Sequence, residues 1–340
     1  MNEPRYFLQE PTAGFRLKSR LERLAPVVAV RRWRRPREAD CYLLSYPKTG
    51  RTWVRVMMGQ LLARHFGHPE LAQVELGARM PRFAGVPHIA AKHDGTPQKK
   101  TAAEISDERS EYAGCRVILL ARDLRDTVVS NYFQVTRREI RFRGDIGTYL
   151  RWPRGSVDGM LKYYNVWANQ RRVPRGFLLV RYEDLHDDTP RELRRIASFL
   201  GLADVRDETI AGAVEYASFG AMKSREAGRA ADASVLAPGK AGDAESFKTR
   251  KGKIGGYAEY LSPKDVAWLN RRIDTELDPY FGYSSAPLPG PGRCWGARPH
   301  SLSVSPRPPG ACRPPPAPAA CVAAPGRSGS GPSCRCLRPR

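Results

Sequence analysis

Four short apolar segments constrain the fold more than any other feature of this 340-residue sequence. Between them lie longer stretches in which apolar side chains recur every three or four positions, as they do on one face of a helix. Strands that alternate with helices are typical of a mostly parallel sheet covered by helices on both faces. The predicted strands are Cys41–Tyr46, His88–Lys92, Arg116–Ala121 and Phe177–Arg181.

Four stretches carry the helical spacing clearly. Thr189 and Ser262 each precede a proline, an arrangement typical of a helix N-cap followed by proline at the first helical position. Apolar residues after the first cap are spaced to face inward: Leu193, Ile196, Ala197 and Leu200. The predicted helices are Thr52–His65, Asp123–Arg138, Pro190–Leu200 and Ser262–Leu277.

Composition divides the chain into three parts. Residues 1–40 form a basic N-terminal arm, in which Arg16–Arg37 is a packing arm, an amphipathic lead-in helix, a lid or a membrane-surface element. Residues 41–283 carry the strand and helix patterns of a single domain. Residues 284–340 are rich in Pro, Arg, Gly and Cys, and such a segment buries too little apolar surface to fold. We therefore expect one folded domain between a basic arm and a disordered tail.

The chain is strongly basic, with a formal net charge of +22. Eight arginines and no lysine or acid follow Ser285, which leaves +14 for the rest of the chain. This surplus favours an anionic ligand, a polyanionic partner or an acidic membrane surface, or else reflects solvated arginines.

Cysteine positions and hydropathy bear on the compartment. Cys41 and Cys115 lie in apolar stretches and are expected to be buried thiols of a reducing compartment. No apolar run reaches the roughly 20 residues of a membrane span, and the N-terminus lacks the apolar core of a signal peptide. We therefore expect a cytoplasmic protein without a transmembrane segment.

The sequence Tyr46-Pro47-Lys48-Thr49-Gly50-Arg51-Thr52-Trp53 joins the first predicted strand to the first predicted helix. At the carboxyl edge of a parallel sheet, such a turn presents main-chain N–H groups and the positive end of the helix to an anion. Lys48 adds a point charge, and Thr49 and Thr52 add hydroxyl donors. Unlike in a nucleotide-binding P-loop, Gly50 follows the lysine instead of preceding it. The turn is a candidate anion site, the alternative being a plain strand–turn–helix with a surface lysine.

Three further stretches carry groups suited to phosphate. Arg122 follows the strand Arg116–Ala121, and Ser130 lies eight residues later, about two helical turns into the next helix. An arginine fork and a hydroxyl so placed could reach one phosphate, although Arg122 alone could equally pair with a nearby acid. Tyr182-Glu183-Asp184-Leu185 ends another strand, and Phe247–Tyr257 is a basic, glycine-rich segment.

Together these four stretches resemble the sulfotransferases that use 3′-phosphoadenosine 5′-phosphosulfate (PAPS). Tyr46–Trp53 is similar to the family's phosphosulfate loop Y-P-K-S-G-T-T-W, and Arg122 and Ser130 match its 3′-phosphate ligands. Tyr182–Leu185 is similar to Y-E-D-[LM], and Arg250-Lys251-Gly252-x-x-Gly255 matches R-K-G-x-x-G. The resemblance implies an α/β fold like that of P-loop NTPases, with a parallel sheet flanked by helices on both faces in a single domain. It also indicates a cytosolic-type member of bacterial origin.

The resemblance implies transfer of a sulfuryl group from PAPS, the co-substrate, to a hydroxyl or amine of an acceptor by in-line displacement, with no metal ion. Lys48 would contact the bridging or leaving oxygen, and Ser130 would restrain it until acceptor is present. His93 would be the general base, with Asp94 either orienting it or acting as the base itself. Trp53 would stack near adenine unless it only packs in the core. The implied cofactor-binding residues are Lys48, Thr49, Gly50, Arg51, Thr52, Trp53, Arg122, Ser130, Tyr182, Arg250, Lys251 and Gly252.

Several positions depart from the family pattern. Arg51 stands where the cytosolic members have Thr, which removes a hydroxyl donor and adds a cation. Gly256-Tyr257 replace Asp-Trp after the R-K-G motif. Phe219 and Met222 resemble only loosely the segment that packs on adenine in relatives.

The acceptor is expected to be a small molecule, a glycan or a lipid, bound by variable segments. Four arginines in the second of these segments favour an acidic or already sulfated acceptor, unless they form a solvated helix face: Arg137, Arg138, Arg141 and Arg143. A homodimer is possible, and no nucleic-acid partner is expected. The segments are Met80–Val86, Phe133–Trp152 and Glu226–Ser246.

Two other classes compete with this prediction. A P-loop small-molecule kinase would need glycines before the lysine and a carboxylate for Mg²⁺. A basic nucleic-acid-binding protein would explain the charge, but its arginines should cluster on one face with interleaved aromatics.

Overall fold

The computed structural model describes residues 39–73, 80, 82–202, 204–228 and 252–285, all within one compact unit. All but the last two residues of the predicted N-terminal arm and all but the first two residues of the predicted tail lie outside the described residues, as do Arg250 and Lys251.

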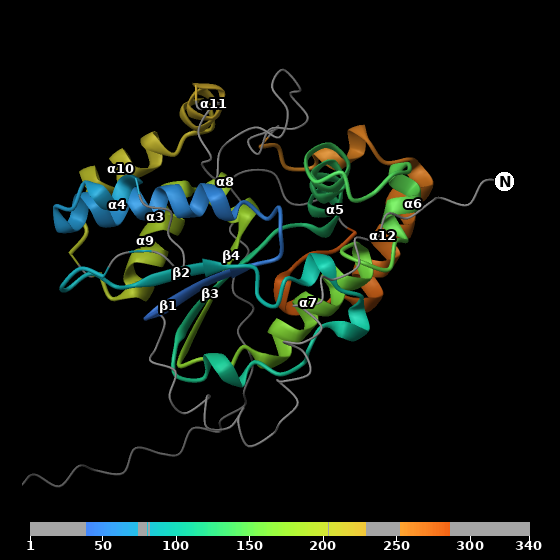
Figure 1. Cartoon of the computed structure of the whole chain (residues 1–340), viewed down its shortest axis with the longest axis horizontal. Coiled ribbons are helices and arrows are strands. Elements are labelled where there is room, and N and C mark those ends of the chain that lie inside the picture. Colours follow the sequence, from blue (N-terminus) through green and yellow to red (C-terminus); the bar gives the residue numbers. More distant parts are fainter. Residues whose placement is uncertain (1–38, 74–79, 81, 203, 229–251, 286–340) are drawn as a thin grey trace, which may run out of the picture. The chain divides into compact units, whose positions relative to one another are not determined.

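The centre of the described chain is a four-stranded parallel sheet (Figure 1). Its strands are β1 (Cys41–Ser45), β2 (Ile89–Lys92), β3 (Arg116–Ala121) and β4 (Gly176–Arg181), in the order β2-β1-β3-β4. Cys41 pairs with Ile89 on one side and with Arg116 on the other, so the carboxyl ends of β1, β2 and β3 reach the same edge. The four predicted strands are confirmed, each to within one residue at either end.

Successive side chains of β1 separate two hydrophobic clusters, one on each face of the sheet. Tyr42 and Leu44 belong to the cluster beneath α5 (Leu124–Phe133), α7 (Val157–Gln170) and α12 (Pro263–Glu276). Cys41 and Leu43 belong to the cluster beneath α3 (Arg51–Phe66), α9 (Thr189–Leu200) and α10 (Asp207–Tyr216).

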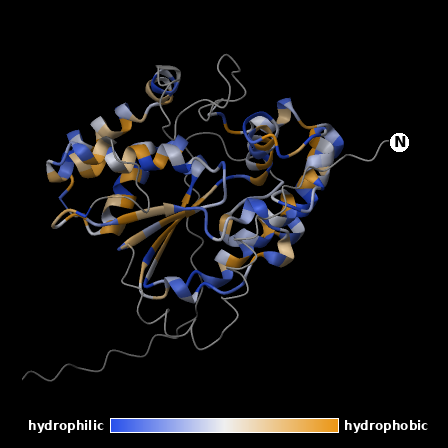
Figure 2. Ribbon diagram, viewed as in Figure 1, coloured by the Kyte–Doolittle hydropathy of each residue, from blue (hydrophilic) through white to orange (hydrophobic). Residues whose placement is uncertain are grey.

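Figure 2 shows apolar strands between these two sets of helices, and each set contributes buried apolar residues to the cluster on its face of the sheet. Each fully buried Leu or Val contributes about 1.5–3 kcal/mol relative to exposure. The predicted fold class, a parallel sheet with helices on both faces, is therefore confirmed.

The remaining elements are short. The helices are α4 (Glu70–Gln73), α6 (Ile146–Leu150), α8 (Tyr182–Asp187) and α11 (Phe219–Gly228). The 3₁₀ turns are Pro97–Lys99, Ala102–Glu104, Ser110–Tyr112, Gly256–Glu259 and Pro279–Phe281, and a π turn spans Gln134–Arg138.

Two predicted helix boundaries are wrong. The cap of α9 is Asp188, whose carboxylate accepts from Arg191 N at 3.0 Å, because the hydroxyl of Thr189 instead donates to the carbonyl of Leu185 at 2.6 Å. The predicted helix Asp123–Arg138 stops being α-helical at Phe133 and continues as the π turn. Ser262, in contrast, caps α12 by accepting from Asp265 N.

Cys41 and Cys115 are both buried thiols, as predicted, and burial raises the pKa of Cys41 to about 12. In the described part of the chain, no helix is both long and apolar enough to cross a membrane.

Candidate active site

The loop between β1 and α3 is tightly wound. Lys48 and Gly50 both have left-handed backbone angles, with φ of 72° and 92°. The buried Thr49 hydroxyl donates to the carbonyl of Tyr46 at 3.0 Å and closes the turn. A Cβ on Gly50 would lie 2.6 Å from the Tyr182 ring, so only glycine fits between the loop and α8. Thr49 therefore shapes the loop and does not line the cavity described below.

The amino end of α3 faces this loop. Its N-cap is Gly50, which has no side chain to satisfy the first amides of the helix. The N–H groups of the first turn and the helix dipole therefore favour an anion at this point.

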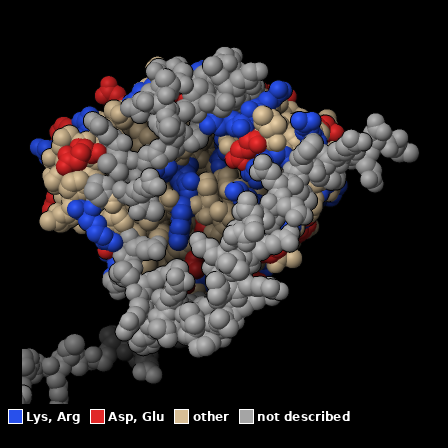
Figure 3. All heavy atoms as spheres, in the orientation of Figure 1, with Lys and Arg blue, Asp and Glu red and all other residues tan. Residues whose placement is uncertain are grey.

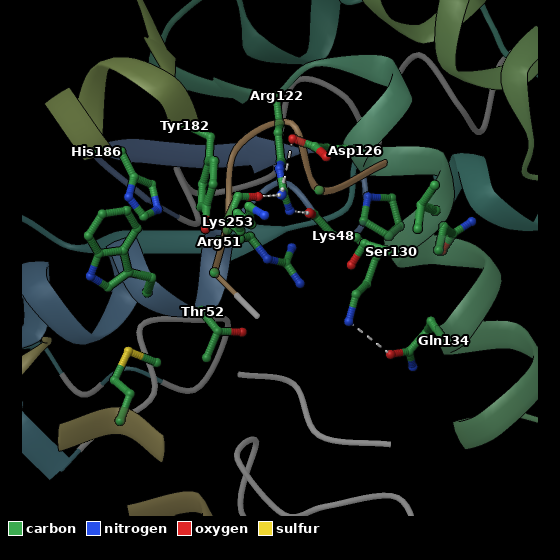
Figure 4. Close-up of a pocket in the computed structure, with 18 of the residues that line it drawn as sticks. Lys48, Arg51, Thr52, Arg122, Asp126, Ser130, Gln134, Tyr182, His186 and Lys253 are labelled. Atoms are coloured by element: carbon green, nitrogen blue, oxygen red, sulfur yellow. Dashed lines mark hydrogen bonds and ion pairs between the residues drawn. The ribbon is translucent and has the colours of Figure 1, made fainter. Parts of the chain in front are cut away.

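A cavity of about 340 Å³ opens at the carboxyl edge of the sheet beside this helix end (Figure 4). Basic side chains gather in a hollow on the face shown in Figure 3. The structure describes eleven of the predicted site residues, and all of them except Thr49 line the cavity: Lys48, Gly50, Arg51, Thr52, Trp53, His93, Arg122, Ser130, Tyr182 and Gly252.

Arg122 occupies one end of the cavity and is held from several sides. Its guanidinium donates to the carbonyl of Lys253 at 3.0 Å, lies 3.5 Å from the Asp126 carboxylate, and stacks on Tyr182 with 4.3 Å to the ring centroid. Its Nε is buried and has no hydrogen-bond partner among the described residues. The Arg122 guanidinium is therefore fixed in place and keeps one N–H donor without a partner. A phosphate oxygen would be a suitable acceptor for it.

Asp126 ties the glycine-rich segment to Arg122. Its carboxylate accepts from Gly255 N at 2.8 Å and from Tyr257 N at 3.0 Å. Burial raises the pKa of Asp126, and the nearby Arg122 opposes this effect. The segment after the R-K-G motif is thus brought against the predicted 3′-phosphate site, although the sequence prediction assigned no such role to Asp126.

Aromatic side chains form another wall. Trp53 lies 5.8 Å from the Tyr182 ring and 5.0 Å from the His186 ring, and all three line the cavity. Phe219 and Met222 line it too, and the Phe219 ring would lie 2.6 Å from a Cβ on Gly252. Burial lowers the pKa of His186, with a contribution from Arg122, which favours the neutral ring. Such a wall suits a purine base.

Lys48 reaches across the cavity to the far end of α5. Its ammonium group donates to the side-chain oxygen of Gln134 at 3.2 Å (Figure 4). The Gln134 amide in turn donates to Glu139 at 2.9 Å, across the π turn. Ser130 lines the cavity one turn before Gln134, so the restraint predicted for Ser130 has a second candidate in Gln134.

His93 is oriented by the main chain. Its Nδ1 donates to the carbonyl oxygen of Ser45 at 3.0 Å. A carbonyl oxygen only accepts, so the proton lies on Nδ1 and Nε2 is the basic nitrogen. The imidazole lines the cavity with Lys48.

The sequence left open that Asp94 orients His93 or acts as the base itself, but the contacts of Asp94 lie elsewhere. Its carboxylate is buried, accepts from the Tyr112 hydroxyl at 2.7 Å and pairs with Arg109 at 2.8 Å, and the residue does not line the cavity. These contacts take away the geometric basis for Asp94 as the base.

Arg51 and Arg55 lie one helical turn apart and both line the cavity. Burial, together with the like charge of Arg55, lowers the pKa of Arg51 to about 10. One terminal nitrogen of Arg51 is buried without a hydrogen-bond partner in the described chain. The substitution that departs from the family pattern thus adds a donor at the predicted phosphosulfate site.

Several lining residues were not named by the sequence prediction, among them Arg55, Gln98, Asp126, Asn131, Gln134, Glu139, His186 and Lys253. Helical spacing could have found two of them, because Gln134 follows Ser130 by four residues and His186 follows Tyr182 by four. No local signal marked Gln98, Asp126 or Lys253.

The described chain is an α/β protein whose cavity combines the amino end of a helix, a buried arginine and an aromatic wall. The family model described as "Sulfotransferase domain" matches residues 38–280. The chain therefore belongs to the sulfotransferase family, as the four motifs predicted, and the kinase and nucleic-acid-binding alternatives are set aside.

Relatives of the chain are plant and animal proteins. It is 27% identical over 277 residues to "Cytosolic sulfotransferase 15" of Arabidopsis thaliana, covering 71% of this chain and 72% of the relative. It is 28% identical over 206 residues to "Sulfotransferase 2A6" of Rattus norvegicus, covering 55% of this chain and 68% of the relative. These matches give no support to the expectation of a bacterial member.

Solved structures share the fold. Mouse sulfotransferase SULT7A1 complexed with PAP matches with a TM-score of 0.51 and 18% identity, covering 74% of this chain and 90% of that one. Retinol dehydratase in complex with androsterone and the inactive cofactor PAP also matches with a TM-score of 0.51 and 18% identity, covering 72% and 83%.

Proposed function

We propose that the protein transfers a sulfuryl group from PAPS to a hydroxyl or amine of a small-molecule, glycan or lipid acceptor. One observation carries the proposal: the amino end of α3, Lys48 and His93 line one cavity together with Arg122, Ser130 and the aromatic wall. Family membership supports the reaction class, and the two structural neighbours that bind PAP support the choice of donor.

Each end of the donor has a matching group. The adenine lies against Trp53 and Phe219, and the 3′-phosphate is held by Arg122 and Ser130. The 5′-phosphosulfate lies at the α3 end, where Lys48 stabilises the negative charge that collects on the leaving phosphate. Arg250 and Lys251 join the 3′-phosphate site by family analogy.

The transfer is an in-line displacement. His93 Nε2 removes the proton as the acceptor oxygen or nitrogen attacks sulfur, and the bond between sulfur and the bridging oxygen breaks. Fixed cations and main-chain amides stabilise the negative charge on the leaving phosphate, and the proposed step therefore needs no metal ion.

A transfer assay with sulfur-labelled PAPS tests this proposal. The acceptors are phenols, alcohols, amines, glycans and lipids. Wild-type protein should label at least one class, and Lys48→Ala should reduce the rate about 10²–10³-fold, the usual effect of removing one stabilising donor. Lys162→Ala, on the exposed side of α7 and paired with Asp107, is the matched control. Absence of labelling in all classes, or full activity of Lys48→Ala, would contradict the proposal.

Two further expectations depend on relatives or on solution work. The relatives named cytosolic support a cytoplasmic location. Homodimer formation stays a prediction, which sedimentation equilibrium would check.

A further inference from the structure

The cavity has two chemically different parts. The wall around Trp53 is aromatic and apolar, with Phe219 and Met222. The part around Lys48 and His93 is lined by three carboxamides and a carboxylate: Gln98, Asn131, Gln134 and Glu139. Since the aromatic wall takes the base of the donor, the carboxamide wall is left to face the acceptor.

Hydrogen bonds connect this carboxamide wall to the lysine. Gln134 accepts from Lys48 and donates to Glu139. Asn131, three residues earlier on α5, donates to the carbonyl of Gly155 at 2.9 Å and to the Tyr149 hydroxyl at 2.7 Å. The wall therefore begins at the lysine and continues along the inner side of α5.

Gly155 joins Gln98 to the same wall. Its φ is +70°, and a Cβ at this position would lie 2.3 Å from the main-chain oxygen of Gln98. The Gly155 N–H donates to Lys100 O at 3.2 Å, which holds the turn Pro97–Lys99 in place. The main chain of Gln98 is therefore fixed five residues beyond His93.

Gln98 lines the cavity and carries an unsatisfied polar atom. Its side-chain oxygen is buried and has no hydrogen-bond partner among the described residues. Leaving a buried polar atom unpaired costs about 1–3 kcal/mol. Turning the amide by 180° would only exchange the oxygen for the nitrogen, so the side chain requires a polar partner in either orientation.

An apolar acceptor would leave the Gln98 side-chain oxygen unpaired. A site built to hydrogen-bond a hydroxyl rejects analogues that lack it far more strongly than an apolar pocket rejects one extra hydroxyl. We propose, on the basis of the function proposed above, that the acceptor is a polyhydroxylated molecule of the carbohydrate or cyclitol class. One hydroxyl is deprotonated by His93, and neighbouring hydroxyls bind Gln98 and the Gln134–Glu139 pair.

The chemical step is the one already described. The acceptor oxygen forms a bond to sulfur, its proton passes to His93 Nε2, and the electron pair of the breaking sulfur–oxygen bond leaves with the 5′-phosphate. Nothing is oxidised or reduced.

Matched acceptors test the proposal. Methyl glycosides of glucose, galactose and mannose, together with myo-inositol, are compared with cyclohexylmethanol, cyclohexanol and phenol in the labelled-PAPS assay. The wild-type kcat/KM for the best polyol should exceed that of every monohydroxyl acceptor at least 100-fold.

Substitution of Gln98 tests whether the preference for polyol acceptors depends on the carboxamide wall. Gln98→Leu should lower kcat/KM for the best polyol 10–100-fold and change it less than threefold for the monohydroxyl acceptors. Gln98→Glu, which keeps an acceptor oxygen, should retain more polyol transfer than Gln98→Leu. Gln170→Leu, at the carboxyl end of α7 and outside the cavity, is the matched control. Unchanged binding of PAP shows that each variant is folded.

Three results have distinct meanings. Equal or better transfer to the monohydroxyl acceptors would overturn the inference, as would a Gln98→Leu variant with wild-type polyol kinetics. Absence of transfer to any acceptor, polyol or monohydroxyl, would instead contradict the proposed function itself.

Discussion

At the residue scale, one main-chain carbonyl decides what His93 can do. Because Ser45 O accepts from Nδ1, the basic nitrogen of the imidazole is Nε2. The sequence predicted His93 as the base but left Asp94 as an alternative. Contacts from Tyr112 and Arg109, distant in sequence, engage Asp94 elsewhere. No local pattern could have shown this.

His93→Ala should lose transfer and keep nucleotide binding. We expect kcat to fall about 10²–10⁴-fold, the usual contribution of a general base, with the Kd for PAP within threefold of wild type. Rapid-quench kinetics and calorimetry measure the two quantities. Near-normal turnover of His93→Ala alongside an inactive Asp94→Asn variant would show that the base is misassigned.

Glu183 is a buried acid whose charge opposes folding. It accepts from Asp123 N at 3.0 Å and from the Tyr283 hydroxyl at 2.8 Å, while burial and the charge of Asp123 raise its pKa to about 7. The folded protein therefore holds a proton that the unfolded chain releases near its ordinary pKa of 4.5. Stability from this group is lost as the pH rises from about 4.5 to about 7.

Glu183→Gln should remove this pH dependence. Relative to wild type, the free energy of unfolding should gain at most about 3 kcal/mol at pH 8 and almost nothing near pH 4.5, because a shifted pKa is worth about 1.4 kcal/mol per unit. Urea unfolding of both proteins at several pH values measures the difference. A difference that is constant with pH, or that grows toward acid, would contradict the pKa assignment.

At the element scale, the unit β1–loop–α3 forms the candidate anion site. Alternating apolar segments were sufficient to predict all four strands, since parallel strands buried on both faces read as continuous apolar runs. They did not predict the π turn at Gln134–Arg138, because its residues keep helical spacing on either side. Gln134 in this turn and Glu139 just after it line the cavity, and the sequence had included both only within the broad acceptor segment Phe133–Trp152.

Substitutions at the two glycines that flank α3 separate the cost of a packing clash from the cost of backbone strain. Gly50 and Gly67 flank the helix with φ of 92° and 72°, but a Cβ would meet the Tyr182 ring only at Gly50. Gly67→Ala should cost about 1–2 kcal/mol for the left-handed backbone. Gly50→Ala should cost about 1–3 kcal/mol more for the clash and should weaken PAP binding. Equal costs in urea unfolding would contradict the role given to Tyr182.

At the scale of the whole molecule, the cavity accounts for part of the positive charge of the chain. Five lining residues of the cavity are cationic, and its two acids, Asp126 and Glu139, each bind partners within it. The sequence predicted this anion site because its motifs are local. It could not predict the acceptor class, because the proposed acceptor wall combines Gln98 with α5 residues more than 30 positions away.

The proposed domain boundaries predict that the tail is dispensable. Residues 286–340 follow the last described residue, lie beyond the family match and carry eight arginines. Removing them should leave the unfolding midpoint in urea and the labelled-PAPS transfer rate within twofold of the full chain. A large loss of either would show that the tail belongs to the folded enzyme.

Binding of PAP tests the central claim most directly, because it requires no acceptor. At 100 times its Kd, a ligand specific to the folded state stabilises it by about 2.7 kcal/mol. Calorimetry and thermal unfolding should show that PAP binds and raises the Tm, that ATP does so much less, and that Arg122→Ala removes most of the preference. If PAP has no effect, or if ATP matches it, the nucleotide site proposed here is wrong.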